Sequence, residues 1–143
     1  MARLGLVGAV VAAAVALAAP AHAAAPNYIL VSGRGLEQPV LLDDWSENLQ
    51  LLVAIGDRPR AKRAALRGLA RRPRFDLAEF WSWNYLSAPT DPREATQHGL
   101  FYPARGRKPA IFKVMVGGTR VPRIASARAL AILARHGVPT RLG

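Results

Sequence analysis

The stretch RFDLAEFWSWNYL, residues 74–86, is expected to organise the fold of this chain. It contains two of the three tryptophans and two of the four phenylalanines. Successive side chains of a β-strand point to opposite faces. A strand here therefore places one alternating set on a single face: Phe75, Leu77, Glu79, Trp81, Trp83 and Tyr85. Each aromatic ring can remove roughly 150–250 Å² from water, so this face should meet either the core or a ligand.

The aromatic face has two possible roles, ligand binding and core packing. Trp81, Trp83 and Tyr85 at a period of two would form a ladder of rings that can stack on sugar rings or nucleobases. Alternatively, the rings form the core of a sheet packed on helices. We favour the packed core, because strand aromatics most often contact their neighbours and a small domain needs their burial.

Glu79 is the one weak candidate for a catalytic residue. A carboxyl group beside indole rings can have a raised pKa and act as a general acid. A glycosidase needs a second carboxylate, and Asp76 points to the other face of the same strand. The alternative is that Glu79 pairs with an arginine across the sheet. No GxSxG motif and no metal-binding histidine spacing occurs, so we predict no metal and no cofactor.

The composition indicates one domain and an excess of positive charge. The 143 residues include 20 Lys and Arg against 9 Asp and Glu, a net charge of +11. This charge suits an anionic partner, although a chain rich in alanine and arginine can acquire it through compositional bias alone. The absence of cysteine excludes disulfides, thiolate zinc sites and thiol nucleophiles.

Residues 1–23 have the pattern of a secretory signal peptide. Arg3 precedes an uncharged apolar run over 4–19, and Ala21-His22-Ala23 fits a cleavage site. We therefore predict a protein that is secreted or held in a bacterial cell envelope, with a mature domain over 24–143. The alternative is an uncleaved anchor, the one membrane contact we expect, although the run is short for a membrane span.

The remaining patterns predict an α+β fold. Strands are expected over 27–32, 39–42, 97–102 and 110–116 besides the central one, and helices over 44–56 and 126–136. Asp44 and Glu47 resemble a capping box, and Gly137 suits a helix end. Because strands come in runs, we predict about five antiparallel or mixed strands with two to three helices on one face.

Residues 58–73 are the most basic part of the chain. A helix here would align four arginines in a basic patch, with alanines opposite them: Arg60, Arg63, Arg67 and Arg71. Such a patch could contact phosphates or an anionic membrane surface. Charged helix faces are more often simply solvated, and we favour that interpretation.

Two functions follow as hypotheses. The first is a small exported, non-catalytic domain that binds an anionic envelope polymer or a partner protein through its arginines. The alternative is a glycan-acting hydrolase or carbohydrate-binding module that uses Glu79 and the face of Trp81, Trp83 and Tyr85. A purely structural protein without a ligand is a third possibility, and no specific nucleic-acid motif occurs.

Overall fold

A computed structural model of the chain describes residues 25–81, 87–116 and 118–143. The predicted signal peptide, Trp83 and Tyr85 lie outside these ranges. The helices and short 3₁₀ turns are α2 (Trp45–Gly56), α3 (Arg63–Leu66), η2 (Leu69–Arg71), η3 (Pro92–Glu94) and α4 (Ala127–Arg135). The strands are β1 (Tyr28–Ser32), β2 (Val40–Leu42), β3 (Phe75–Phe80), β4 (Gln97–Tyr102), β5 (Ala104–Arg105), β6 (Ile111–Val116), β7 (Thr119–Ile124) and β8 (Arg141–Leu142).

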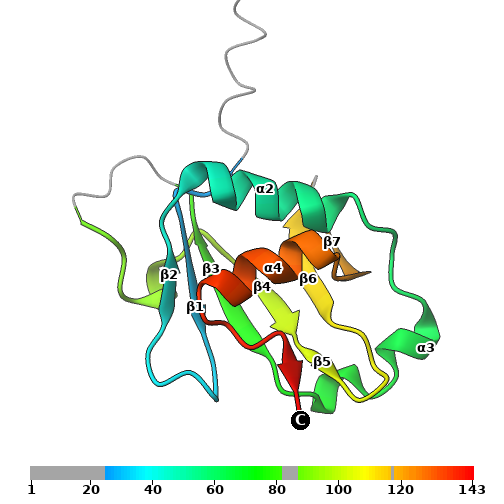
Figure 1. The fold of residues 1–143 in the computed structure, drawn as a ribbon. Helices are drawn as coiled ribbons and strands as arrows, with labels where there is room; N and C mark the ends of the chain where they lie inside the picture. Colours follow the sequence, from blue (N-terminus) through cyan, green and yellow to red (C-terminus); the bar gives the residue numbers. More distant parts are fainter. Residues whose placement is uncertain (1–24, 82–86, 117) are drawn as a thin grey trace, which may run out of the picture.

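The fold is α+β, with a six-stranded antiparallel sheet in the order β2-β1-β3-β4-β6-β7 (Figure 1). The five strands predicted from the sequence are present, and β3 lies at the centre as expected. β7 was not predicted, because Pro122 interrupts its sequence and proline cannot donate a hydrogen bond within a sheet. As the edge strand of this sheet, β7 tolerates that missing donor. A small parallel pair, β5 and β8, lies apart from the main sheet.

Helices α2 and α4 cover one face of the sheet, where the main core lies (Figure 1). Phe75, Leu77, Phe101 and Phe112 point into this core, and the rings of Phe101 and Phe112 stack at 4.7 Å between centroids. Ala78 and Phe80 belong to a separate cluster with Leu30. The alternation predicted for the central strand is therefore confirmed over 75–80.

The opposite face is covered in part by the basic segment that follows α2. Leu69 packs there against Tyr102 and Ile111, which point away from α2 because their neighbours Phe101 and Phe112 point toward it. The expectation that the helices share one face holds for α2 and α4 only. The basic segment does not form the one helix considered from the sequence: α3 ends at Leu66, Arg67 is extended, and Gly68 has a left-handed φ of 74°. A glycine adopts that conformation without steric cost, so Gly68 lets the chain turn between α3 and η2.

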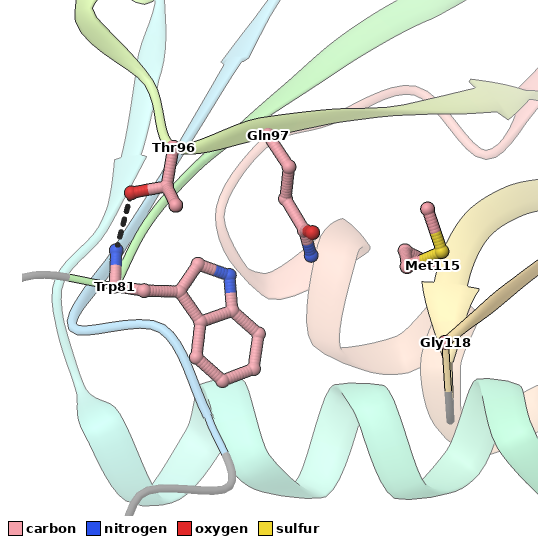
Figure 2. A pocket seen from close by; sticks show the side chains of 5 residues that line it. All are labelled: Trp81, Thr96, Gln97, Met115 and Gly118. Atoms are coloured by element: carbon pink, nitrogen blue, oxygen red, sulfur yellow. Dashed lines mark hydrogen bonds between the residues drawn. The ribbon is translucent and has the colours of Figure 1, made fainter.

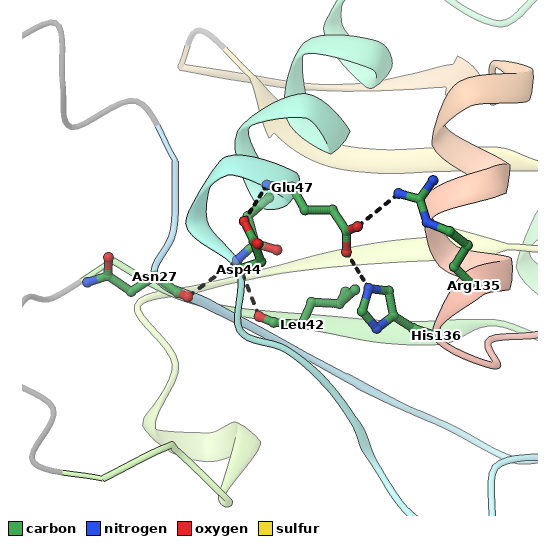
Figure 3. A network of polar contacts seen from close by, with 7 residues as sticks. Asn27, Leu42, Asp44, Glu47, Arg135 and His136 are labelled. Atoms are coloured by element: carbon green, nitrogen blue, oxygen red, sulfur yellow. Dashed lines mark hydrogen bonds and ion pairs between the residues drawn. The ribbon is translucent and has the colours of Figure 1, made fainter.

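Helix α2 begins as the sequence predicts. The Asp44 carboxylate accepts a hydrogen bond from the Glu47 amide at 2.9 Å. The Glu47 side chain instead crosses to the end of α4, where Arg135 Nη2 donates to it at 2.8 Å and the His136 ring also contacts it (Figure 3). Burial alone would raise the pKa of Glu47, but hydrogen bonds from His136 and Arg135 outweigh it and lower that pKa. This ion pair therefore joins the two helices.

Asn48 links the beginning of the described chain to α2 through hydrogen bonds. Its buried amide nitrogen donates to the carbonyl oxygens of Pro26, Asn27 and Leu42 at 3.1, 3.3 and 3.2 Å. Buried polar groups are usually hydrogen-bonded, and three backbone carbonyls share the two N–H groups of this amide. The contacts place 26–27 and the end of β2 against the helix start.

The chain covers the outer edge of β7 with its own backbone. The Ala61 amide donates to the Pro122 carbonyl at 2.8 Å, and Arg60 forms an antiparallel bridge with Arg123. At the other edge, β2 is only three residues long. Both edges of the sheet are thus short or covered.

Candidate functional site

A cleft opens where β4 and β6 separate. Their ladder runs from Tyr102↔Ile111 to Leu100↔Lys113 and does not extend to the start of β4 in the part of the chain that the structure describes. The cleft has a volume of about 380 Å³, within the range of small-molecule sites. It is lined by Trp81, Thr96, Gln97, Met115 and Gly118 (Figure 2).

Trp81 forms one wall of this cleft. Its backbone amide donates to Thr96 Oγ1 at 3.2 Å, which holds the residue beside the start of β4. The side chain is half-buried and packs against the main core. Its indole nitrogen is buried without a hydrogen-bond partner among the described residues. Figure 2 shows the nitrogen edge of the ring turned toward Gln97, so this donor faces the cleft side.

Glu79 lies next to this wall, on β3, and is only 1% exposed. It faces Ile29 on β1 and Gln97 on β4. Gln97 Nε2 donates to Glu79 Oε2 at 3.0 Å, while Oε1 is buried without a partner among the described residues. Burial raises the pKa of Glu79 to about 7, although the Gln97 hydrogen bond and the charges of Arg120 and His98 act in the opposite direction.

The partner of Glu79 differs from the expected arginine. The carboxyl group is hydrogen-bonded to an amide, and arginine acts on it only through its charge. Arg120 donates its own hydrogen bond to the carbonyl oxygen of His98. A neutral partner compensates a buried negative charge less well than a guanidinium would, which is why burial dominates the pKa.

Asp76 and His98 contact each other on the opposite face of the sheet. The two oxygens of Asp76 lie 3.1 and 3.0 Å from His98 Nδ1, and both side chains are partly exposed. Asp76 is thus directed away from Glu79, as strand alternation predicts. Glycosidic hydrolysis needs a carboxylate pair, and the residues that directly face Glu79 on both neighbouring strands, Ile29 and Gln97, carry no carboxyl group.

The sequence singled out Trp81 and Glu79 but not the rest of the cleft. Gln97, Met115 and Gly118 come from β4, β6 and the following turn, and nothing local marks them as neighbours. Trp83 and Tyr85 lie outside the described residues, so the proposed ladder of rings stays a prediction.

The four arginines of the predicted basic patch lie on separate short elements. Arg60 precedes α3, Arg63 begins it, Arg67 follows its last residue and Arg71 ends η2. All four are exposed. They are therefore solvent-facing as expected, but no helix aligns them in a stripe.

A second basic turn, over 103–109, lies against this segment. Arg72 Nη2 donates to the carbonyl oxygens of Pro103 and Pro109 at 2.6 and 2.8 Å, and Lys108 Nζ donates to the Ala64 carbonyl at 3.0 Å. Arg141 Nη1 donates to the Gly106 carbonyl at 3.0 Å. Segments far apart in the sequence thus lie side by side, and their basic residues are together called the basic surface: Arg60, Arg63, Arg67, Arg71, Arg105, Arg107, Lys108 and Arg141.

Among the described residues, no side-chain carboxylate forms an ion pair with the basic surface. The sequence has no acidic residue over 58–75 or over 95–143. Within the described ranges, the ion pairs involve Arg93, His98, Arg135 and His136, none of which belongs to the basic surface. Its charges are therefore available to an external anion.

The described residues contain no group of three or more His, Cys, Asp or Glu side chains that could hold a metal ion. None of the helices they form has the length and apolar character needed to cross a membrane. No protein-family model, curated protein or solved structure matches this chain.

Proposed function

We propose that this protein is an exported, non-catalytic domain that binds an anionic polymer through its basic surface. The observation that supports the proposal is the meeting of 60–71, 105–108 and Arg141, with no ion-paired side-chain carboxylate within the described ranges. A polymer with regularly spaced negative charges can contact several of these side chains at once. Such binding releases counterions and weakens as salt is added.

The contacts of Arg72 indicate that the basic surface is an ordered part of the fold. Arg72 is half-buried, and its bonds to Pro103 and Pro109 hold the second turn beside η2. Burial lowers the pKa of Arg72, while the charge of Tyr102 acts in the opposite direction and that of Arg105 in the same one. This arginine serves the fold, and its exposed neighbours are left for the ligand.

The proposal is tested by binding to heparin, an anionic polysaccharide, with neutral dextran as the comparison polymer. We expect binding to heparin alone. By analogy with nucleic acids, about four charge contacts would lower the affinity roughly 10²-fold between 50 and 200 mM salt. Binding that is insensitive to salt, or equal binding to dextran, would refute the charge argument.

A matched pair of double variants locates the contact. Arg67→Ala with Arg107→Ala removes two exposed charges from the basic surface, and Arg34→Ala with Arg128→Ala removes two exposed charges elsewhere. The first pair should lower heparin affinity about tenfold and flatten its salt dependence, while the second should change both much less. Equal losses in the two variants would mean that only net charge matters. Export is tested separately, by determining the N-terminal sequence of protein recovered from the secreted fraction.

A further inference from the structure

We infer that the cleft between β4 and β6 is a binding site for one neutral sugar ring. This inference is independent of the basic surface. The cleft lining is Trp81, Thr96, Gln97, Met115 and Gly118, none of them charged, in a chain with 20 basic residues. An uncharged lining favours an uncharged ligand, because a charged one would lose its hydration without a counter-charge in contact.

The polar groups around the cleft match hydroxyl groups. The indole nitrogen of Trp81 can donate, and it lacks a partner among the described residues. Gln97 uses its amide nitrogen on Glu79, which leaves its side-chain carbonyl oxygen as an acceptor. A sugar hydroxyl both donates and accepts, so one ring can satisfy donors and acceptors placed side by side. Unpaired buried polar atoms are costly, which gives the ligand a reason to bind.

The size and apolar surface of the cleft fit the same class. A volume of about 380 Å³ suffices for a single ring. Trp81 and Met115 offer apolar contact to its C–H groups. Burial raises the pKa of Glu79 to about 7, so at pH 6 this carboxyl is mostly protonated and adds no charge beside the cleft. With few contacts, a monosaccharide should bind with a dissociation constant on the order of 1 mM.

The test is a titration of the full chain with N-acetylglucosamine at pH 6, followed by the indole N–H signals in nitrogen-15 NMR spectra. Trp45 is an internal control, because it also has a buried, unpartnered indole nitrogen but does not line the cleft. We expect a saturable shift of the Trp81 signal and little change at Trp45. Absence of a saturable shift, or equal shifts at both residues, would overturn the inference.

Variants and a charged sugar complete the test. Trp81→Phe should weaken binding at least tenfold, and Met115→Ala about threefold, while Val53→Ala on the exposed side of α2 should have no effect. If Trp81→Phe does not fold, the Met115 and Val53 variants decide the matter. Glucuronate should bind more weakly than N-acetylglucosamine. Tighter glucuronate binding, or unchanged affinity in Met115→Ala, would contradict a neutral-sugar site at this cleft.

Discussion

Replacement of Glu79 by glutamine should stabilise the protein at neutral and alkaline pH. In the folded state burial raises the pKa of this carboxyl from 4.5 to about 7. Between these values the folded chain holds a proton that the unfolded chain has lost, so the free energy of unfolding falls as the pH rises. Glutamine cannot ionise and keeps an amide in place of the carboxyl, so the variant lacks this contribution.

The magnitude follows from the two pKa values. The difference between a pKa of 4.5 and one of about 7, at about 1.36 kcal/mol for each pH unit, corresponds to roughly 3 kcal/mol. This advantage of Glu79→Gln should be absent below pH 4.5, grow up to pH 7 and remain constant above it. Relative to a typical domain stability of about 5–15 kcal/mol, the effect is large.

Urea denaturation monitored by circular dichroism, at pH values from 4 to 8.5, measures the difference between variant and wild type. Groups that do not interact with Glu79 contribute equally in the two proteins and cancel in that difference. Glu37→Gln is the control, because Glu37 is exposed and its replacement should give a difference that changes little with pH. A constant difference for Glu79→Gln across the range, or a less stable variant at pH 8, would refute the reasoning.

Three further substitutions test the packing of the fold. Glu47→Gln should destabilise the protein at neutral pH, because His136 and Arg135 stabilise only the ionised form of Glu47. The loss of stability should shrink as the pH falls through the lowered pKa of Glu47. Denaturation at several acidic pH values measures this dependence. Asn48→Ala should cost about 2–4 kcal/mol, measured by thermal unfolding, since three carbonyl groups lose their donor. Gly99→Ala should cost about 1–3 kcal/mol in the same assay, because its Cβ would lie 2.9 Å from Val114 Cγ2; an unchanged melting temperature would show that β6 yields easily.

Local sequence patterns predicted most of the secondary structure. The alternation over 75–80, the Asp44 cap and the left-handed Gly137 depend on neighbours within a few residues, and the structure has all three. The periodicity of the arginines does not produce one helix over the basic segment, because Arg67 is extended and Gly68 is left-handed between α3 and η2. β7 was not predicted because Pro122 argues against a strand, and the sequence does not show that this strand lies at a sheet edge.

The candidate site was less predictable, because it depends on contacts between distant segments. The sequence could mark Glu79 and Trp81 as unusual, but their neighbours Gln97 and Met115 follow only from the sheet order and the separation of β4 from β6. Glu79 is hydrogen-bonded to Gln97 rather than to an arginine because the register of β3 and β4 places Gln97 opposite it. Likewise, the basic turn at 103–109 joins 60–71 only through the Arg72 and Lys108 contacts.

The covered edge of β7 also bears on how the molecules behave at high concentration. Open strand edges are where separate copies of a protein can pair and grow into fibrils. Here the backbone of Arg60 and Ala61 already occupies part of that position, and Pro122 has no amide hydrogen to offer an incoming strand. Concentrated solutions should therefore resist strand-by-strand assembly for as long as the segment after α2 stays in place.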